Sequence, residues 1–428
     1  MKHALIPALI ILTSLTMPVT GAEEFSFDIS EFEKKPFEVE GHFEARFEHF
    51  RLDQDSSLYR LNFYNQPERS ELDRQTGIVE LSGRFQQNNF LLAFTGHAEA
   101  SDDQQTSNEE LAFYEAYAAF RSVPELSVEL GKRSFKWGKA YAWNLLGFVE
   151  RPKDPNEPEL AREGYTVLSA DMIYSGNGPL QTLAFTPVYL PVREELNSDY
   201  GETEHDNFAA KLYLLYHDID IDLAYLSNGS RDDRFGLDFA ANLSTNFEIH
   251  GEWSYIRDYS KAVTDSSGNM TIQQADANSY LLGVRYLTEN ETTFIIEYYR
   301  NGIGYSKAEM QDYYQLIDNA VESHNNSLLQ LARSLGKQGY TQRNPGRQYL
   351  YIRISNKEPF DLLYFTPAIS SIVNLEDDSY SLSPEFSYTG VTNLELRFKA
   401  TILNGERYSE FAEKQNDTKY ELRLRYYF

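Results

Sequence analysis

The sequence contains no cysteine among its 428 residues. This absence excludes a disulfide framework and a lipid-modified N-terminal cysteine. No apolar run is long enough for a membrane-spanning helix, since the longest covers only residues 4–19. That run follows Lys2 and His3 and precedes Gly21 and Ala22, a pattern typical of a secretory signal peptide cleaved after Ala22. We therefore predict an exported protein that is not a lipoprotein, of about 406 residues after cleavage (428 minus 22).

Positive charge is scarce, with 39 Lys and Arg against 65 Asp and Glu and a net charge of −26. Such a charge disfavours nucleic acid as a partner, because phosphates would be repelled.

Recognisable catalytic and cofactor motifs are also missing. The eight histidines are scattered, and no Gly-rich phosphate loop or His/Cys metal pattern is present. The acidic residues 376–378 lack the spacing of a calcium loop. We expect no enzyme, no cofactor and no metal; the alternative is an outer-membrane hydrolase whose groups come from distant strands.

Aromatic residues are abundant, with 31 Tyr and 27 Phe. Many of them alternate with polar residues, as Phe37, Phe43 and Phe47 do with the glutamates between them. Successive side chains of a strand point to opposite faces, so this alternation predicts strands with one apolar and one polar face. Similar alternation occurs at residues 79–85, 90–98, 208–216, 235–243, 247–255 and 394–402.

The predicted strands are joined by connections that alternate in length. Eight short turns and nine mostly longer polar loops, one of them at residues 258–276, give 17 connections and hence 18 strands. An even count with short turns on one side predicts an all-β fold, a transmembrane antiparallel barrel over residues 37–428. Residues 23–36 are then a short periplasmic segment, too short for a plug domain. A count of 16 is the alternative, because segments such as 126–133 and 180–188 are less regular.

The chain ends in the regular strand YELRLRYYF. A barrel must close, so this strand is expected to pair with the first one. The pattern resembles the final strand of Gram-negative outer-membrane β-barrels, which the insertion machinery reads. That resemblance implies the outer membrane, its lipid, the barrel-assembly machinery and periplasmic chaperones as surroundings and partners, and it leaves open whether the barrel forms homotrimers. The residues that match the terminal pattern are Tyr420, Leu422, Leu424, Tyr426 and Phe428.

Closure brings acidic and basic residues together at the seam. Glu38, Glu40 and Glu44 lie on the polar face of the first strand, and Arg423 and Arg425 on that of the last. Opposite charges across paired strands help to set the register. The sequence favours structural ion pairs here, and the alternative is a ladder of charges for a substrate; in either case the same charges can help to polarise the lumen.

The third outer loop, residues 134–164, departs from the acidic balance of the chain. Residues 131–163 carry seven basic against five acidic residues, and the loop holds two of the three tryptophans. Three prolines disfavour a regular helix or strand in its second half. Its candidate cations, with the flanking residue of the preceding strand, are Arg133, Lys136, Lys139, Arg151, Lys153 and Arg162.

In position and length this loop resembles the third loop of general porins, which folds inward and narrows the pore. The run GKRSFKWGKAYAWN also resembles a stretch of specific porins and alginate-export-type barrels. The resemblance implies that cations line a constriction, that aromatics offer stacking surfaces and that two polar residues hold the loop's fold. In the alternative, the tryptophans are anchors and the cations pair with nearby carboxylates. The implied residues are Arg133, Lys136, Lys139 and Arg151 for the constriction, Trp137, Tyr141 and Trp143 for stacking, and Asn144 and Asp154 for the loop's fold.

The seventh loop, residues 301–347, has helical periodicity. Ser306 and Glu309 form a capping-box pattern, and apolar residues then recur at helical spacing on both sides of residues 324–326. This predicts a helical hairpin at the barrel mouth, acting either as a lid or as a simple cover of the rim.

Together these features predict a passive outer-membrane channel, selective for small and anionic solutes. Two alternatives stay open: a hydrophobic-compound transporter of the fatty-acid-transporter type, and a surface adhesin or structural barrel whose lumen is blocked.

Overall fold

The computed structural model describes residues 36–428 except 104–105 and 161. The predicted signal peptide, residues 1–22, and nearly all of the segment 23–36 lie outside this part of the chain. Among the described residues, none of the helices combines the length and the apolar character needed to cross a bilayer.

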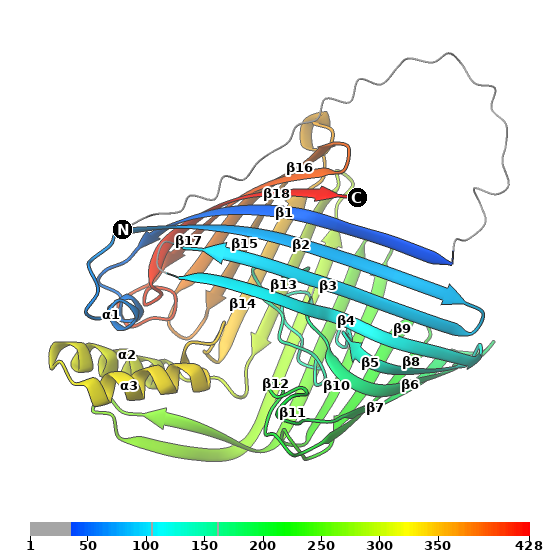
Figure 1. The fold of residues 1–428 in the computed structure, drawn as a ribbon, viewed down its shortest axis with the longest axis horizontal. Coiled ribbons are helices and arrows are strands. Elements are labelled where there is room, and N and C mark those ends of the chain that lie inside the picture. The colour runs from blue at the N-terminus through cyan, green and yellow to red at the C-terminus, as the bar shows by residue number, and fades with distance from the viewer. Residues whose placement is uncertain (1–35, 104–105, 161) are drawn as a thin grey trace. The chain divides into compact units, whose positions relative to one another are not determined.

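Eighteen antiparallel strands make up one sheet (Figure 1). Their bounds are β1 Phe37–Leu52, β2 Glu71–Gln87, β3 Phe90–Asp102, β4 Ser107–Val123, β5 Leu126–Arg133, β6 Tyr165–Ser175, β7 Leu180–Leu190, β8 Asn207–Tyr216, β9 Ile219–Leu226, β10 Arg234–Ser244, β11 Phe247–Thr264, β12 Met270–Leu287, β13 Thr292–Arg300, β14 Gln348–Asn356, β15 Phe365–Asn374, β16 Tyr380–Val391, β17 Leu394–Asn404 and β18 Asn416–Tyr427.

The sheet closes on itself because β1 pairs with β2 on one edge and with β18 on the other. Figure 1 shows β1 running between these two strands. Closure leaves no sheet edge whose backbone groups would be unsatisfied in lipid. The predicted fold class and the count of 18 strands are therefore confirmed.

The two faces of the wall differ as the alternation predicts. On β1, Phe43 and Phe47 are 51% and 44% exposed, whereas Glu44 and Glu48 between and beside them are buried inside the barrel. Large exposed apolar side chains recur on the other strands, among them Leu81, Phe235, Leu282, Phe398 and Leu422. An outward apolar band around a polar interior is what a barrel needs to reside in a bilayer.

The seam between β1 and β18 is set by buried ion pairs. Glu44 lies directly opposite Arg425 in the register, and their side chains approach to 2.5 Å. Glu44 also contacts Arg46 at 2.5 Å and Arg423 at 3.5 Å. Three guanidinium groups that the strand alternation forces into the interior thus share this carboxylate, and Arg423 also pairs with Glu421 at 2.7 Å.

Among the described residues, the end of the seam where β1 begins and β18 ends has no such ion-pair network. Glu38 and Glu40 are exposed near the start of β1, and neither has an ion-pair partner within the described part of the chain. Phe428 extends the pairing beyond β18, since it exchanges two backbone hydrogen bonds of 3.0 Å with Gly41. Its ring lies 5.0 Å from that of Phe43 on the outward face.

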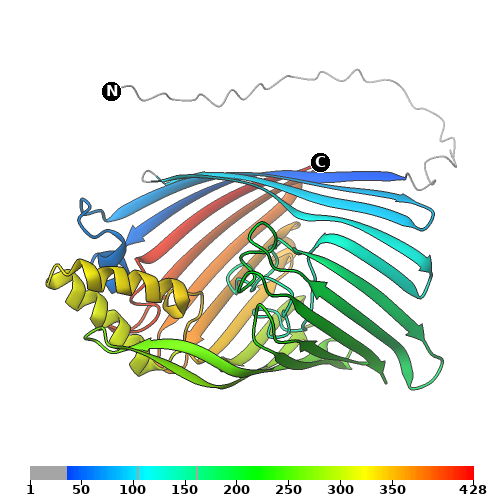
Figure 2. The ribbon, with the colours of Figure 1, turned by 60° about the horizontal axis from the view of Figure 1, so that its bottom comes forward.

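Within the described residues, the α-helices lie in loops at the opposite end of the barrel from Phe428 (Figures 1 and 2). The first loop contains α1 Ser57–Asn62, and the seventh contains α2 Lys307–Glu322, α3 Asn326–Leu335 and the π-turn η2 Gly336–Tyr340. A short 3-10 turn, η3 Pro359–Asp361, lies between β14 and β15. The capping box at Ser306 and Glu309 is present at the start of α2.

One predicted loop is wrong. Residues 258–276 were expected to be a polar connection, but β11 and β12 continue through most of this range and turn only between Thr264 and Met270. The extension exists because it packs against the helical hairpin: Val263 is buried in one apolar cluster with α2 and α3, and a Cβ on Gly268 would lie 2.8 Å from Leu328. This tertiary contact stabilises strands that lack their own apolar alternation.

Replacing Glu44 tests the seam. We expect Glu44→Gln to lower the free energy of unfolding by about 3 kcal/mol, because Arg46 loses its carboxylate partner and Arg423 and Arg425 each lose one of theirs. Glu38→Gln, on the same strand face but exposed and unpaired among the described residues, should change it by less than about 0.5 kcal/mol. Urea unfolding in detergent measures both, and equal effects of the two changes would contradict the account.

Candidate functional site

The third loop folds into the barrel instead of projecting beyond it. It joins β5 to β6, and Figure 2 shows the segment, in teal, inside the ring of strands. Its residues contact β11, β13, β17 and β18 on the far side of the lumen. The loop therefore crosses the barrel and is fixed to its far wall.

Glu252 on β11 holds the first part of this loop. Its two carboxylate oxygens accept hydrogen bonds from the backbone N–H groups of Lys139 (2.7 Å), Ala140 (2.6 Å) and Leu145 (2.7 Å). Gly138 makes the approach feasible: its φ is +95°, and a Cβ there would lie 2.6 Å from the Glu252 Oε1 atom. Glycine adopts this conformation without the strain that other residues would suffer.

Glu297 on β13 holds the next residues of the loop in the same way. It accepts hydrogen bonds from the backbone N–H groups of Tyr141 (2.5 Å) and Ala142 (2.9 Å), and its Oε1 atom lies 2.8 Å from His250 Nε2. Two buried carboxylates thus satisfy most of the backbone donors of residues 139–145. Buried donors need such partners, because an unpaired one costs about 1–3 kcal/mol.

In the second half of the loop, the carboxylate belongs to the loop and its partners belong to the wall. Glu157 contacts Arg397 at 2.6 Å, Lys399 at 3.2 Å and Arg423 at 3.4 Å, all on the inner face of β17 and β18. Burial alone would raise the pKa of Glu157, but these cations hold it well below its usual range. The loop is therefore anchored to two separate parts of the wall.

Glu150 supports the loop from within. It accepts a hydrogen bond from the Trp137 backbone N–H and forms an ion pair of 3.1 Å with Arg162. Burial raises the pKa of Glu150 to about 7 despite these partners. Asn144 completes the arrangement, donating to Glu150 and accepting a hydrogen bond of 3.0 Å from the Lys153 backbone N–H.

The aromatic residues of the loop are packing groups in this structure. Trp137 and Trp143 are only 3% and 7% exposed. The Trp143 ring packs against Tyr299, Tyr349 and Tyr351 of β13 and β14, with ring centres 4.9–6.1 Å apart. These contacts leave Trp143 no free face for a solute to stack on.

An inner cavity of about 900 Å³ remains between the third loop and the inner face of strands β2 to β8. We call this strand face the near wall. A small solute can be held in this cavity between loop and strands. Cations and carboxylates both line it.

The predicted cations differ in whether they form ion pairs with carboxylates of the protein. Arg133, the last residue of β5, is paired with Glu115 at 3.1 Å and Glu129 at 3.0 Å. Lys139 lies 3.2 Å from Asp222, whose charge outweighs burial and raises the lysine's pKa.

Lys136 and Lys153 line the cavity without a carboxylate partner in the part of the chain that is described. The Lys136 side chain is exposed to the cavity. Lys153 donates to the Ala140 carbonyl at 2.5 Å, and burial lowers its pKa. Lys136 therefore offers its charge to a solute directly, whereas the Lys153 ammonium is half-buried near the carboxylates of Glu252 and Glu150.

Several predicted site residues lie away from the cavity lining. Arg151 pairs with Glu163 at 2.5 Å and with Asp199, and Asp154 pairs with Arg343 at 3.4 Å. Tyr141 donates to Glu159 at 3.2 Å. The predicted residues outside the cavity lining are Tyr141, Trp143, Asn144, Arg151 and Asp154, and those that line it are Arg133, Lys136, Trp137, Lys139, Lys153 and Arg162.

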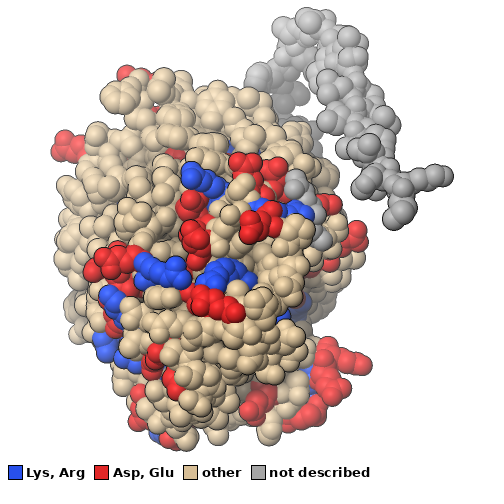
Figure 3. Space-filling model, turned by 90° about the vertical axis from the view of Figure 1, so that its left-hand side faces the viewer, with Lys and Arg blue, Asp and Glu red and all other residues tan. Residues whose placement is uncertain are grey.

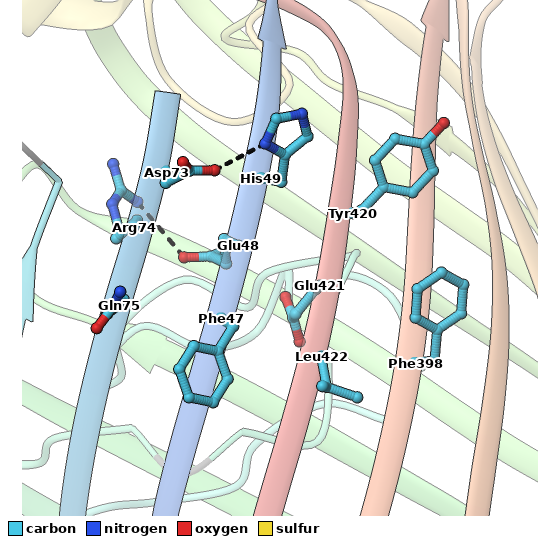
Figure 4. Close-up of a pocket in the computed structure, with 10 residues that line it drawn as sticks. All are labelled: Phe47, Glu48, His49, Asp73, Arg74, Gln75, Phe398, Tyr420, Glu421 and Leu422. Carbon is cyan, nitrogen blue, oxygen red and sulfur yellow. Dashed lines mark hydrogen bonds and ion pairs between the residues drawn. The ribbon is translucent and has the colours of Figure 1, made fainter. Parts of the chain in front are cut away.

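A second, smaller hollow of about 350 Å³ lies at the seam strands β17, β18, β1 and β2 (Figure 4). Its apolar members, Phe47, Phe398 and Leu422, belong to the exposed outward series, and His49 lies 2.7 Å from Asp73 there. This hollow therefore faces the outside of the barrel and takes no part in the lumen.

The helical hairpin of the seventh loop is tied to the rim. Asp318 of α2 contacts Arg60 of α1 and Arg407 of the loop between β17 and β18, both at 2.7 Å. Figure 3 shows this end of the barrel, where basic and acidic side chains lie against each other across the middle of the face. None of the described residues of the seventh loop lines the inner cavity.

No family model matches the chain, and no curated protein matches its sequence. Solved structures do. OccK5 (OpdH) of Pseudomonas aeruginosa matches with a TM-score of 0.54 at 11% identity, over 91% of this chain and 98% of that one. OccK11 (OpdR) of the same organism gives 0.51 at 12% identity, over 91% and 95%. OpdQ, also from P. aeruginosa, gives 0.51 at 10% identity, over 91% and 98%.

The chain has the fold of Gram-negative outer-membrane porins. The predicted class is therefore confirmed at the level of architecture. The porin fold and its outward apolar band support a location in the outer membrane of a Gram-negative bacterium.

The sequence does not reveal the residues that position the third loop. Glu252 and Glu297 are recognisable only as carboxylates on the polar face of their strands. Their partners lie 106 to 156 residues away in the chain. The sequence also gives no sign that Asp171 and Lys211 line the cavity. Strand alternation shows which face of the sheet a side chain lies on, but it does not show which residues it contacts.

Replacing Glu252 tests the anchoring of the third loop. Glu252→Gln presents an amide N–H₂ to backbone donors, so we expect a loss of about 1–3 kcal/mol and a loosened loop in an intact barrel. Glu248→Gln, on the same face of β11 but with no loop donor to accept among the described contacts, should have little effect. Limited proteolysis at residues 134–164 is the measurement, and equal protection in both variants would contradict the anchor.

The pKa of Glu150 predicts a pH dependence. A carboxyl group whose pKa is raised to about 7 on folding contributes stability below its unfolded value near 4.5, and this stability is lost as pH rises through 7. Hydrogen exchange at the Trp137 amide should therefore be more protected at pH 5 than at pH 8, after correction for intrinsic rates. Glu150→Gln should flatten this difference, and protection that increases with pH in the unmodified protein would overturn the assignment.

Proposed function

We propose that the protein is an outer-membrane channel through which small solutes bearing an anionic group diffuse passively. The solutes would pass through the inner cavity, between the third loop and the near wall. The observation that carries this proposal is the pair of lysines, Lys136 and Lys153, that face the cavity without a carboxylate partner among the described residues.

The size of the cavity supports small solutes. About 900 Å³ is within the range of sites that hold small molecules. The anchored third loop keeps the passage narrow, because it is fixed to the far wall by Glu252, Glu297 and Glu157. A fixed loop favours diffusion through a permanent opening over a large conformational cycle.

Electrostatics supports the anionic group. In a narrow space with low-dielectric walls, an unpaired ammonium attracts anions more strongly than in bulk water. The other cations are less available: Arg133 is shared by two carboxylates and Lys139 is paired with Asp222. The proposed activity is transport, with outer-membrane lipid and the solute as partners and no catalytic step.

The burial of Trp137 and Trp143 disfavours the hydrophobic-compound alternative, since these rings pack against protein and offer no apolar path through the third loop. The adhesin alternative requires a blocked lumen, whereas the inner cavity is open enough to hold a solute.

Planar-bilayer recordings test the proposal. In a tenfold KCl gradient we expect open channels whose reversal potential has the sign of a membrane more permeable to chloride than to potassium. Changing Lys136 and Lys153 to Gln should lower the chloride-to-potassium permeability ratio about two- to fivefold, as expected for losing roughly 1 kcal/mol of attraction.

Lys337→Gln is the control, because Lys337 is exposed in the seventh loop and does not line the cavity. A folded barrel that never conducts would contradict the channel. A conducting barrel that prefers potassium would contradict the anionic preference.

A further inference from the structure

The charges that line the inner cavity are separated between its two sides. The third loop contributes four cations and one carboxylate, Glu159. The near wall contributes four carboxylates and two cations, Arg133 and Lys211. The loop side therefore carries a formal excess of three positive charges (4 minus 1), and the near wall an excess of two negative charges (4 minus 2). The loop cations are Lys136, Lys139, Lys153 and Arg162, and the wall carboxylates are Glu80, Glu115, Glu129 and Asp171.

The separation survives when ion pairs are taken into account. On the wall, Glu115 and Glu129 share the single guanidinium of Arg133, at 3.1 and 3.0 Å, so one negative charge is left over. Asp171 on β6 accepts a hydrogen bond of 2.6 Å from the Thr186 hydroxyl and has no cationic partner among the described residues.

On the loop side, Lys139 pairs with Asp222 and Arg162 with Glu150. Lys136 and Lys153 have no carboxylate within ion-pair distance in the described part of the chain, so these two cations remain against the single loop carboxylate Glu159. A cation and a carboxylate that are both free thus face the same cavity from opposite sides, Lys136 from the loop and Asp171 from the wall.

We infer that the inner cavity selects small zwitterions, solutes that carry an anionic and a cationic group on one short skeleton. Such a solute places its carboxylate toward Lys136 and its ammonium toward Asp171, so both of its charges lose water against a partner of opposite sign. A simple anion is repelled by the excess negative charge of the wall, and a simple cation is repelled by the excess positive charge of the loop. This inference rests on the proposed channel function and specifies its substrate class.

Liposome swelling with four probes of similar size tests the inference: β-alanine as zwitterion, butanoate as anion, butylammonium as cation and butanamide as neutral solute. We expect β-alanine to enter several-fold faster than butanamide. Lys136→Gln and Asp171→Asn should each reduce the ratio of β-alanine to butanamide about two- to fivefold. The asparagine can still accept from Thr186, so the wall should be preserved.

The two variants must also act in opposite directions on the single-charge probes. Lys136→Gln should slow butanoate and Asp171→Asn should accelerate it, while Lys337→Gln leaves all four rates unchanged. Heat-modifiability on gels confirms that each barrel is folded.

The outcomes separate the inference from the proposed function. If β-alanine is no faster than butanamide while butanoate exceeds butylammonium, the zwitterion inference is overturned and the anionic channel stands. If neither variant alters the β-alanine ratio, the assignment to Lys136 and Asp171 is overturned. If no probe enters through a folded barrel, the proposed function fails and the inference with it.

Discussion

The structure depends on buried carboxylates that accept backbone N–H groups across the lumen. The described residues of the third loop form no regular secondary structure, so their backbone donors need partners from elsewhere. Glu252 and Glu297 on the far wall accept hydrogen bonds from these donors. Glu157 of the loop forms ion pairs with cations on β17 and β18. Without these contacts the loop would carry unpaired groups into the barrel, and its path would not be defined.

Fixing the loop to the far wall creates the cavity on its other side. Residues 139–145 are hydrogen-bonded to β11 and β13. Lys136 and Lys153 therefore line the cavity on the other side of the loop, opposite strands β2 to β8. Those strands present more carboxylates than cations. The separation of charge across the cavity is therefore a consequence of how the loop is anchored, and the same carboxylates that look purely structural decide which cations a solute meets.

The sequence predicts the barrel well because alternation and turn spacing are local signals. It places the third loop correctly between β5 and β6, and it finds the capping box of α2. It misses the outer part of β11 and β12, whose strands are stabilised by packing on α2 and α3 and not by their own alternation. It also cannot separate the free Lys136 from the paired Arg133, since the register of the β4–β5 hairpin, which brings Glu115 to Arg133, is not fixed by alternation alone.

The most direct test of the central claim is cysteine accessibility in the conducting channel. The chain has no native cysteine, so Lys136→Cys introduces a single thiol. If the third loop is anchored inside the lumen with residue 136 facing the passage, a charged methanethiosulfonate reagent added to the open channel should react there and lower the single-channel conductance. A cysteine at Trp143, buried against β13 and β14, should resist the reagent in the same recordings. Modification at position 136 that leaves the current unchanged would contradict the account.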